Sequence, residues 1–184
     1  MELKLYMVLL GGKPTGRHTE QHDVFFGIAS SLKELIPAFN HFWPEAKGKM
    51  HVDGWREVKN VNGYEVSVTP KSDFNSTDAQ LFFINLGGYK KDEFEEFHYK
   101  LVIAAETLSK AIQLAKQTAF FKHTHFEGAA SHVDDKYGID VDDMYKVEDI
   151  LPSEMKNNYS ITLTKNENLE TDPIHLGYFK FENL

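Results

Sequence analysis

Residues 5–12 read LYMVLLGG and residues 81–88 read LFFINLGG, so one apolar run and one pair of glycines occur twice in the 184-residue chain. The two stretches lie 76 positions apart. Keeping that shift over residues 5–39 gives nine identities in 35 positions without a gap. A match of this length at one fixed offset indicates an internal duplication. The sequence therefore predicts two copies of one structural unit in tandem.

The duplication includes histidines. His22 in the first copy corresponds to His98 in the second at the shift of 76. Further along, the His-Val-Asp triplet at residues 51–53 occurs again at residues 132–134, where the offset has grown to 81. Each copy is therefore expected to hold one histidine and one His-Val-Asp triplet at matching positions.

Each apolar run is expected to form the first strand of its copy. Because glycine permits sharp turns, the strands are predicted to stop at Gly11-Gly12 and at Gly87-Gly88. A helix is expected next, since an apolar stripe that starts at His22 recurs at helical spacing over residues 22–36. Its counterpart covers residues 98–115, and the second helix is expected to run on toward residue 120.

The remaining strands are predicted from short apolar runs and turn residues. One is expected around residues 50–53, and two more flank Asn62-Gly63, a dipeptide typical of a two-residue hairpin. In the second copy the acidic pair Asp142-Asp143 falls at about the position of that turn. Residues 159–164 and 175–181 are expected to form two further strands.

The order β-α-β-β, found twice, predicts an α+β fold. We expect mixed sheets, two main helices and a pseudo-twofold relation between the copies. The first copy is expected to span residues 1–70 and the second residues 80–151, with a junction at residues 71–79. Residues 152–184 are expected to supply C-terminal strands that complete the second copy.

Composition limits the classes of function. The chain has no cysteine, which excludes disulfides and thiolate metal sites. Its net charge of −8 would repel a phosphate backbone, so nucleic-acid binding is not expected. The first apolar run is too short for a secretory signal or a membrane span. A cytoplasmic protein without a membrane partner is expected.

Several strings in both copies resemble the bacterial DUF1543 family. They are QHDVFFGIA at residues 21–29, FWPEA at 42–46, HVDGW at 51–55, NLGGY at 85–89 and HVDDKY at 132–137. The resemblance extends to about residue 151 and implies one or two family domains per chain. It implies no activity and no catalytic residue.

The repeated polar residues are the candidate site. The predicted ligand-binding residues are His22, His51, Asp53, Gly11 and Gly12 in the first copy, and His98, His132, Asp134, Gly87 and Gly88 in the second. In a strand, residues two apart share a face, so the His and Asp of a triplet project together. Because His22 and His98 begin apolar stripes, they are expected to be buried and to hydrogen-bond either a neighbouring strand or the Asp of a triplet.

Two interpretations of this set remain open. In the favoured one the groups only hydrogen-bond one another, and the chain is a non-catalytic module that binds a small molecule or a protein without a cofactor. In the alternative, His22, His51 and Asp53 hold a divalent metal such as Zn²⁺ or Fe²⁺, and the chain is a metal-dependent enzyme of hydrolase type. The substrate and the oligomeric state do not follow from the sequence.

Overall fold

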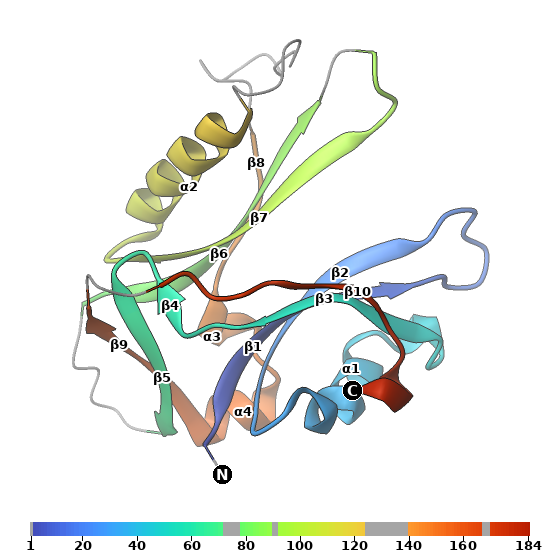
Figure 1. Ribbon diagram of the computed structural model, residues 1–184, viewed down its shortest axis with the longest axis horizontal. Helices are drawn as coiled ribbons and strands as arrows, with labels where there is room; N and C mark the ends of the chain where they lie inside the picture. Colours follow the sequence, from blue (N-terminus) through green and yellow to red (C-terminus); the bar gives the residue numbers. More distant parts are fainter. Residues whose placement is uncertain (1, 72–77, 90–91, 124–139, 167–169) are drawn as a thin grey trace. The chain divides into compact units, whose positions relative to one another are not determined.

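The computed structural model describes residues 2–71, 78–89, 92–123, 140–166 and 170–184 (Figure 1). The chain divides into two compact units. The first unit comprises Met1–Ser76 and Ile150–Leu184, and the second comprises Thr77–Asp149. Ten strands in three sheets, together with a few helices, confirm the predicted α+β class for the described part of the chain.

The main sheet of the first unit has four antiparallel strands in the order β10-β3-β1-β2. The strands are β1 (Lys4–Gly12), β2 (Gln21–Ala29), β3 (Met50–Glu57) and β10 (His175–Phe179). Between β2 and β3 the chain forms α1 (Ile36–Phe42), flanked by the 3-10 turns η1 (Leu32–Leu35) and η2 (Pro44–Ala46). Alternate residues of β1, among them Val8 and Leu10, pack with Phe39 of α1 in the core. The polar residues His22 and His51, which lie opposite Gly11, project from the other face of this sheet.

A smaller antiparallel sheet also belongs to the first unit. It has the order β4-β5-β9 and consists of β4 (Asn60–Val61), β5 (Tyr64–Pro70) and β9 (Tyr159–Lys165). The predicted hairpin is confirmed, because Val61 pairs with Tyr64 across Asn62-Gly63. Both turn residues have positive φ, as such a turn requires. The unit is completed by α4 (Ser153–Asn158) and the 3-10 turn η3 (Phe181–Asn183).

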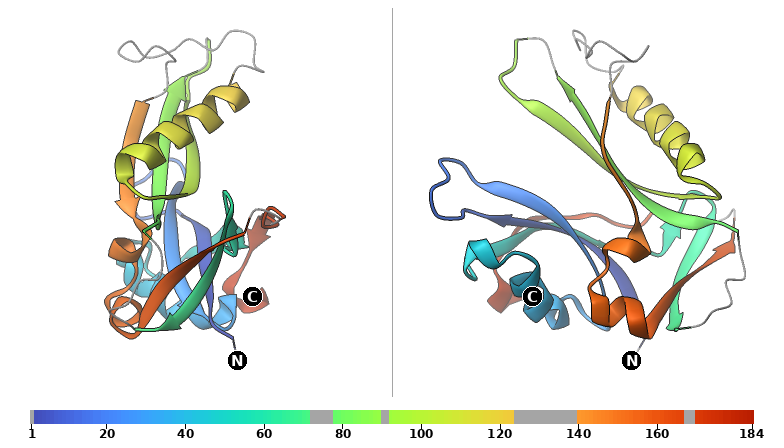
Figure 2. Two further views of the ribbon diagram at one scale, coloured as in Figure 1. Left: turned by 90° about the vertical axis from the view of Figure 1, so that its left-hand side faces the viewer. Right: turned by 180° about the vertical axis from the view of Figure 1, so that it is seen from behind.

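The second unit has one three-stranded antiparallel sheet in the order β7-β6-β8. Its strands are β6 (Gln80–Tyr89), β7 (Glu96–Ala105) and β8 (Asp140–Lys146). Helix α2 (Leu108–His123) lies along one face of this sheet, where Ala111 and Ala115 pack with Ile84 and Leu86 (Figure 2). The short helix α3 (Val147–Ile150) leads from this unit into the first.

The two main sheets agree residue by residue, which fits the predicted duplication. Gly11 of β1 pairs with His22 on one side, and the corresponding Gly87 of β6 pairs with His98. The pairing of β1 with β3 shifts register between Leu9 and Leu10, and that of β6 with β8 shifts between Asn85 and Leu86. These positions are again 76 apart. Each unit thus has the element order β-β-α-β with an irregularity at the same place.

The predicted helices over residues 22–36 and 98–115 are wrong in their first halves. Residues 21–29 and 96–105 form β2 and β7, and the helices follow them. The C-terminal halves of these strands, VFFGIA and LVIAA, are apolar on both faces and are almost wholly buried. Such a continuous apolar run is compatible with either a strand or a helix by periodicity alone. The first strands do end at the glycine pairs as predicted, although they include them: β1 ends at Gly12 and β6 at Tyr89, one residue after Gly88.

Three further expectations need correction. The sheets are antiparallel rather than mixed. The tail does form the two predicted strands, but β9 pairs with β5 and β10 with β3, so residues 152–184 complete the first unit and not the second. Finally, Asp142 and Asp143 lie within β8 and not at a hairpin turn.

Candidate functional site

A row of three residues crosses the main sheet of the first unit. Gly11 of β1 lies directly opposite His22 of β2 on one side and opposite His51 of β3 on the other. Residues opposite one another on antiparallel strands project from the same face of the sheet. The two imidazoles therefore extend over a glycine that has no side chain to separate them.

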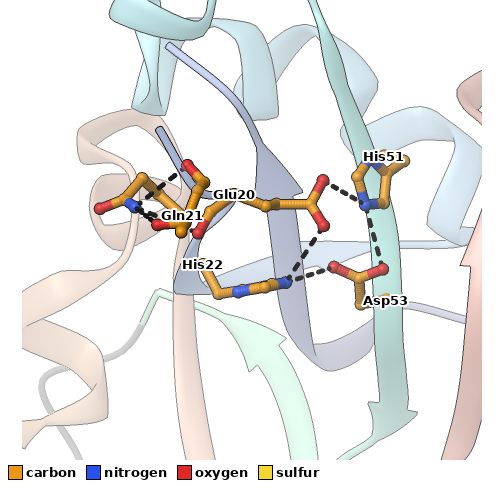
Figure 3. Close-up of polar contacts among 6 residues, drawn as sticks. Glu20, Gln21, His22, His51 and Asp53 are labelled. Atoms are coloured by element: carbon orange, nitrogen blue, oxygen red, sulfur yellow. Dashed lines mark hydrogen bonds and ion pairs between the residues drawn. The ribbon is translucent and has the colours of Figure 1, made fainter. Parts of the chain in front are cut away.

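The register shift places a carboxylate beside both imidazoles. Leu10 pairs with Val52 and Leu9 with Gly54, so Asp53 is an extra residue on β3. Such a bulge re-aims the side chain that it carries. The Asp53 carboxylate reaches both rings, with 3.1 Å from Oδ2 to His22 Nε2 and 3.0 Å from Oδ1 to His51 Nε2 (Figure 3).

Glu20, the residue that precedes β2, completes this group of polar side chains. Its Oε1 lies 3.3 Å from His51 Nε2, and its Oε2 lies 3.8 Å from His22 Nε2. Figure 3 shows the result, in which two ring nitrogens and two carboxylates alternate around a common centre. We call Glu20, His22, His51 and Asp53 the first cluster.

Exposure differs sharply within the first cluster. His51 is only 5% exposed, whereas the side chains of His22 and Glu20 are 43% and 45% exposed. The expected burial of His22 is therefore wrong, although its expected contact with Asp53 is present. Two atoms at the centre, His51 Nε2 and Asp53 Oδ2, are shielded from solvent and have no hydrogen-bond partner. The contacts of these two atoms, 3.1 Å from Asp53 Oδ2 to His22 and 3.0 Å from His51 Nε2 to Asp53 Oδ1, are short but lack the geometry of a hydrogen bond.

Gly11 is required by this arrangement. A Cβ atom at position 11 would collide with Asp53 Oδ2 and lie 2.5 Å from His51 Nε2. Gly12 has a different role, because a Cβ there would lie 3.2 Å from the carbonyl oxygen of Lys49 and near Ala46, on the core face. Of the two glycines predicted as ligand-binding residues, only Gly11 borders the first cluster.

The second unit carries a related group. His98 Nε2 lies 3.3 Å from Asp142 Oδ2 and 3.9 Å from Glu96 Oε2. We call Glu96, His98 and Asp142 the second cluster; their side chains are between 30% and 40% exposed. A Cβ at Gly87 would collide with the Asp142 carboxylate, as one at Gly11 would with Asp53. Gly88 is the next residue of β6 and therefore projects to the opposite face.

The predicted second triplet is not the counterpart of the first by strand pairing. Gly87 pairs with Asp140 as Gly11 pairs with His51, and Leu86 pairs with Val141 as Leu10 pairs with Val52. The offset between the copies at this strand is thus 89, not 81, and Asp140 stands where the first copy has His51. The predicted site residues His132 and Asp134 lie outside the described residues.

Three members of the clusters were not predicted as site residues. Glu20 and Glu96 are identical at the shift of 76, and each precedes its histidine by two positions. In an extended chain that spacing places both side chains on one face, so the signal was available. Asp142 was obscured by the string HVDD at residues 132–135, which matches HVDG at 51–54 better than DVDD at 140–143 does.

Comparison with known proteins supports a family domain and the fold. A model of the family "Domain of Unknown Function (DUF1543)" matches residues 17–68, a segment that includes the whole first cluster. The crystal structure of a protein Il1583 from Idiomarina loihiensis is similar in fold, with a TM-score of 0.66 and 23% sequence identity over 97% of each chain. No curated protein matches the sequence. Among the described residues, no helix is long and apolar enough to cross a membrane.

Proposed function

We propose that the first cluster binds a divalent metal ion and that the chain is a metal-dependent enzyme of hydrolase type. One observation supports the metal site: His51 Nε2 and Asp53 Oδ2, at the centre of the first cluster, are both buried and have no hydrogen-bond partner. An unpaired buried polar atom costs about 1–3 kcal/mol, and a bound cation would use both lone pairs. A scaffold held only by hydrogen bonds would leave that cost in place.

The distances fit a small ion with nitrogen and oxygen ligands. Zinc is bound at about 2.0–2.2 Å by imidazole nitrogen and carboxylate oxygen, and a tetrahedron of such bonds has edges of about 3.3 Å. The four nitrogen-to-oxygen distances in the first cluster are 3.0, 3.1, 3.3 and 3.8 Å. Glu20, His51 and Asp53 each offer a ligand atom within 4.8 Å of the other two, and His22 adjoins this group through its contact with Asp53. Two imidazoles with carboxylates suit Zn²⁺ or Fe²⁺.

Charge supports the same proposal. With neutral imidazoles the two carboxylates give the first cluster a charge of −2, concentrated around a shielded centre. Like charges this close are unfavourable unless a cation lies between them. A divalent ion would neutralise the cluster.

Glu20 is the ligand that suggests catalysis. It is exposed, it precedes β2 and does not lie within it, and it makes the longest of the four contacts. The other three donors project from within β2 and β3. A catalytic metal keeps one position for water or substrate, and lowers the pKa of that water toward neutrality. A bound metal ion would supply this activation, and Glu20, the exposed donor, would then be placed to accept the proton of the attacking water.

A second candidate is a binding module with a structural metal. Four convergent protein donors are typical of closed structural sites, which carry no open position. The two candidates differ in what Glu20 does. In a structural site Glu20→Gln would weaken metal binding severely, whereas in the catalytic site the metal would stay and hydrolysis of a simple ester such as p-nitrophenyl acetate would fall.

The metal itself is tested by elemental analysis and by calorimetric titration of the full chain with Zn²⁺. We expect about one ion per chain, bound in the first cluster. His51→Ala should lower the affinity by more than about 100-fold, since even the loss of a group that merely orients a ligand costs 10- to 100-fold. The matched variant His98→Ala should leave this binding unchanged. Equal effects of the two substitutions, or no bound metal in the parent protein, would refute the proposal.

A further inference from the structure

The edge strand β10 exposes large apolar side chains next to the first cluster. It is the outermost strand of the main sheet and pairs with β3. Leu176 is 74% exposed and Tyr178 is 67% exposed. Exposed apolar groups that gather in one place commonly mark a binding surface. The positions of Leu176 and Tyr178 relative to His51 and Asp53 indicate the kind of ligand that this surface would bind.

Tyr178 lies against the buried histidine. The ring centroids of Tyr178 and His51 are 4.1 Å apart, with an angle of 32° between the ring planes. One face of the Tyr178 ring therefore covers His51. Because Tyr178 remains largely exposed, the rest of the ring borders the surface beside the first cluster.

Leu176 lies on the same side of the sheet. It pairs with Gly54, the residue after Asp53, and its Cδ2 is 3.0 Å from the place that a Cβ on Gly54 would occupy. The same place is 3.8 Å from the Cβ of Leu9, which precedes Gly11 by two residues on the cluster face of β1. Leu9, Leu176 and Tyr178 thus form an apolar border along the first cluster.

Gly177 allows the strand to place its side chains in this way. Its φ is +156°, and the pairing of β10 with β3 shifts register between Leu176 and Phe179. A side chain at position 177 would also press on the Phe179 ring, with its Cβ at 3.2 Å. The irregularity lets Tyr178 cover His51 while Phe179 packs on the core.

We infer that the ligand of the metal centre is a small amphipathic molecule. Its head carries oxygen donors and binds the metal in the position that Glu20 yields, and its apolar body lies on Leu176 and Tyr178. This inference rests on the proposed metal site and names the class of molecule that the site accepts. A purely polar ligand would make no apolar contact with Leu176 and Tyr178. A purely apolar ligand would have no oxygen donor with which to replace the Glu20 carboxylate on the metal.

The experiment uses two metal-binding probes that differ in their apolar part, acetohydroxamate and benzohydroxamate. Each is titrated calorimetrically into the zinc-loaded full chain. We expect benzohydroxamate to bind about tenfold more tightly, since partial burial of a phenyl ring on apolar side chains is worth about one power of ten in affinity. Tyr178→Ala and Leu176→Ala should remove most of this preference, measured as the ratio of the two affinities in proteins loaded to the same zinc content. Tyr178→Phe should retain the preference, because the ring and not the hydroxyl makes the contact.

Phe94→Ala is the matched control, because Phe94 is a fully exposed aromatic residue of the second unit. It should leave the ratio of the two affinities as in the parent protein. A zinc-loaded protein that binds both probes with a ratio unaffected by Tyr178→Ala and Leu176→Ala would overturn the inference while the metal site stands. A protein that binds no zinc would overturn the proposed function first.

Discussion

The two clusters occupy the same place in two matching sheets, yet only one has the features of a complete site. Both place a glutamate, a histidine and a bulged aspartate around a glycine. They differ at the position opposite that glycine, which is His51 in the first unit and Asp140 in the second. They differ also in cover, since Tyr178 lies over His51 while the described part of the second unit has no strand beside β8 other than β6. The comparison teaches that the sheet geometry supplies the arrangement, and that one residue and one added strand distinguish the first cluster from the second.

The largest expected effect comes from making the second cluster resemble the first. Asp140→His would place a second imidazole opposite Gly87, as His51 is placed opposite Gly11. We expect the metal content to rise from about one toward two ions per chain, with the added site about 100-fold stronger than the parent second cluster, because the variant adds an imidazole, a good zinc ligand. Zinc titration with elemental analysis measures both quantities.

Asp143→His is the control for this gain. Asp143 pairs with Asn85, two positions from the glycine, so a histidine there is not in the row that crosses Gly87. It should add no site. A second ion bound equally well by both variants would show that register does not determine the difference between the clusters.

A smaller effect is expected when the glycines are filled. Gly11→Ala introduces a methyl group where Asp53 Oδ2 and His51 Nε2 now lie, so both side chains must shift. Extra methyl groups in a packed place cost about 1–3 kcal/mol, and the metal affinity should fall with the stability. At Gly87→Ala the nearest group is the Asp142 carboxylate, which is more exposed than that of Asp53, so this substitution should cost less. Urea unfolding of the two variants gives the free energies to compare; a larger loss for Gly87→Ala would contradict the account.

The smallest expected effect concerns an ion pair that the second unit lacks. Lys4 of β1 donates a hydrogen bond of 2.7 Å to Glu57 of β3, whereas the corresponding residues of the second unit are Gln80 and Lys146. Burial acts to raise the pKa of the Glu57 carboxyl, but hydrogen bonds from Lys4 and Lys59 outweigh it and hold the pKa below its usual value. A lowered pKa in the folded state means that the pair stabilises the fold at neutral pH and loses that effect as the pH falls through the folded-state value.

Glu57→Gln should therefore reduce the free energy of unfolding by about 0.5 kcal/mol at neutral pH, the usual size for a partly exposed pair. The difference from the parent protein should vanish in acid. Urea unfolding of both proteins at neutral and at acidic pH measures it. A difference that persists unchanged in acid would mean that the effect arises from packing and not from charge.

Much of the fold followed from local patterns in the sequence. The apolar run at residues 5–12, the Asn62-Gly63 hairpin and the two strands of the tail are specified by neighbouring residues, and all were predicted as strands. The error at residues 22–36 has a physical cause. The strand end VFFGIA is buried on both faces and runs into the apolar residues of η1 and α1, so the two elements together imitate the spacing of one helix.

The candidate site was predictable in part. His22, His51 and Asp53 were found because His22 recurs as His98 and the string HVD occurs twice in the sequence, and the three residues do converge. The role of Gly11 was missed because glycine is required there to leave space for the carboxylate of Asp53. That residue lies 42 positions later, and the sequence does not show that the two are neighbours. The counterpart of His51 was missed because it is an aspartate, and only strand pairing identifies the position.

The place of β10 in the chain has a consequence for how the protein is made. The strands that carry Gly11, His22 and His51 are synthesised before the second unit, whereas residues 175–179, which pair with β3, are synthesised after it. Segments generally fold as units in the order of their synthesis. A growing chain therefore presents the edge of β3 and one face of the His51 ring without cover until translation has passed the second unit. The first unit is therefore completed only after the second has been made, and the surface inferred to select its ligand joins it at that late stage.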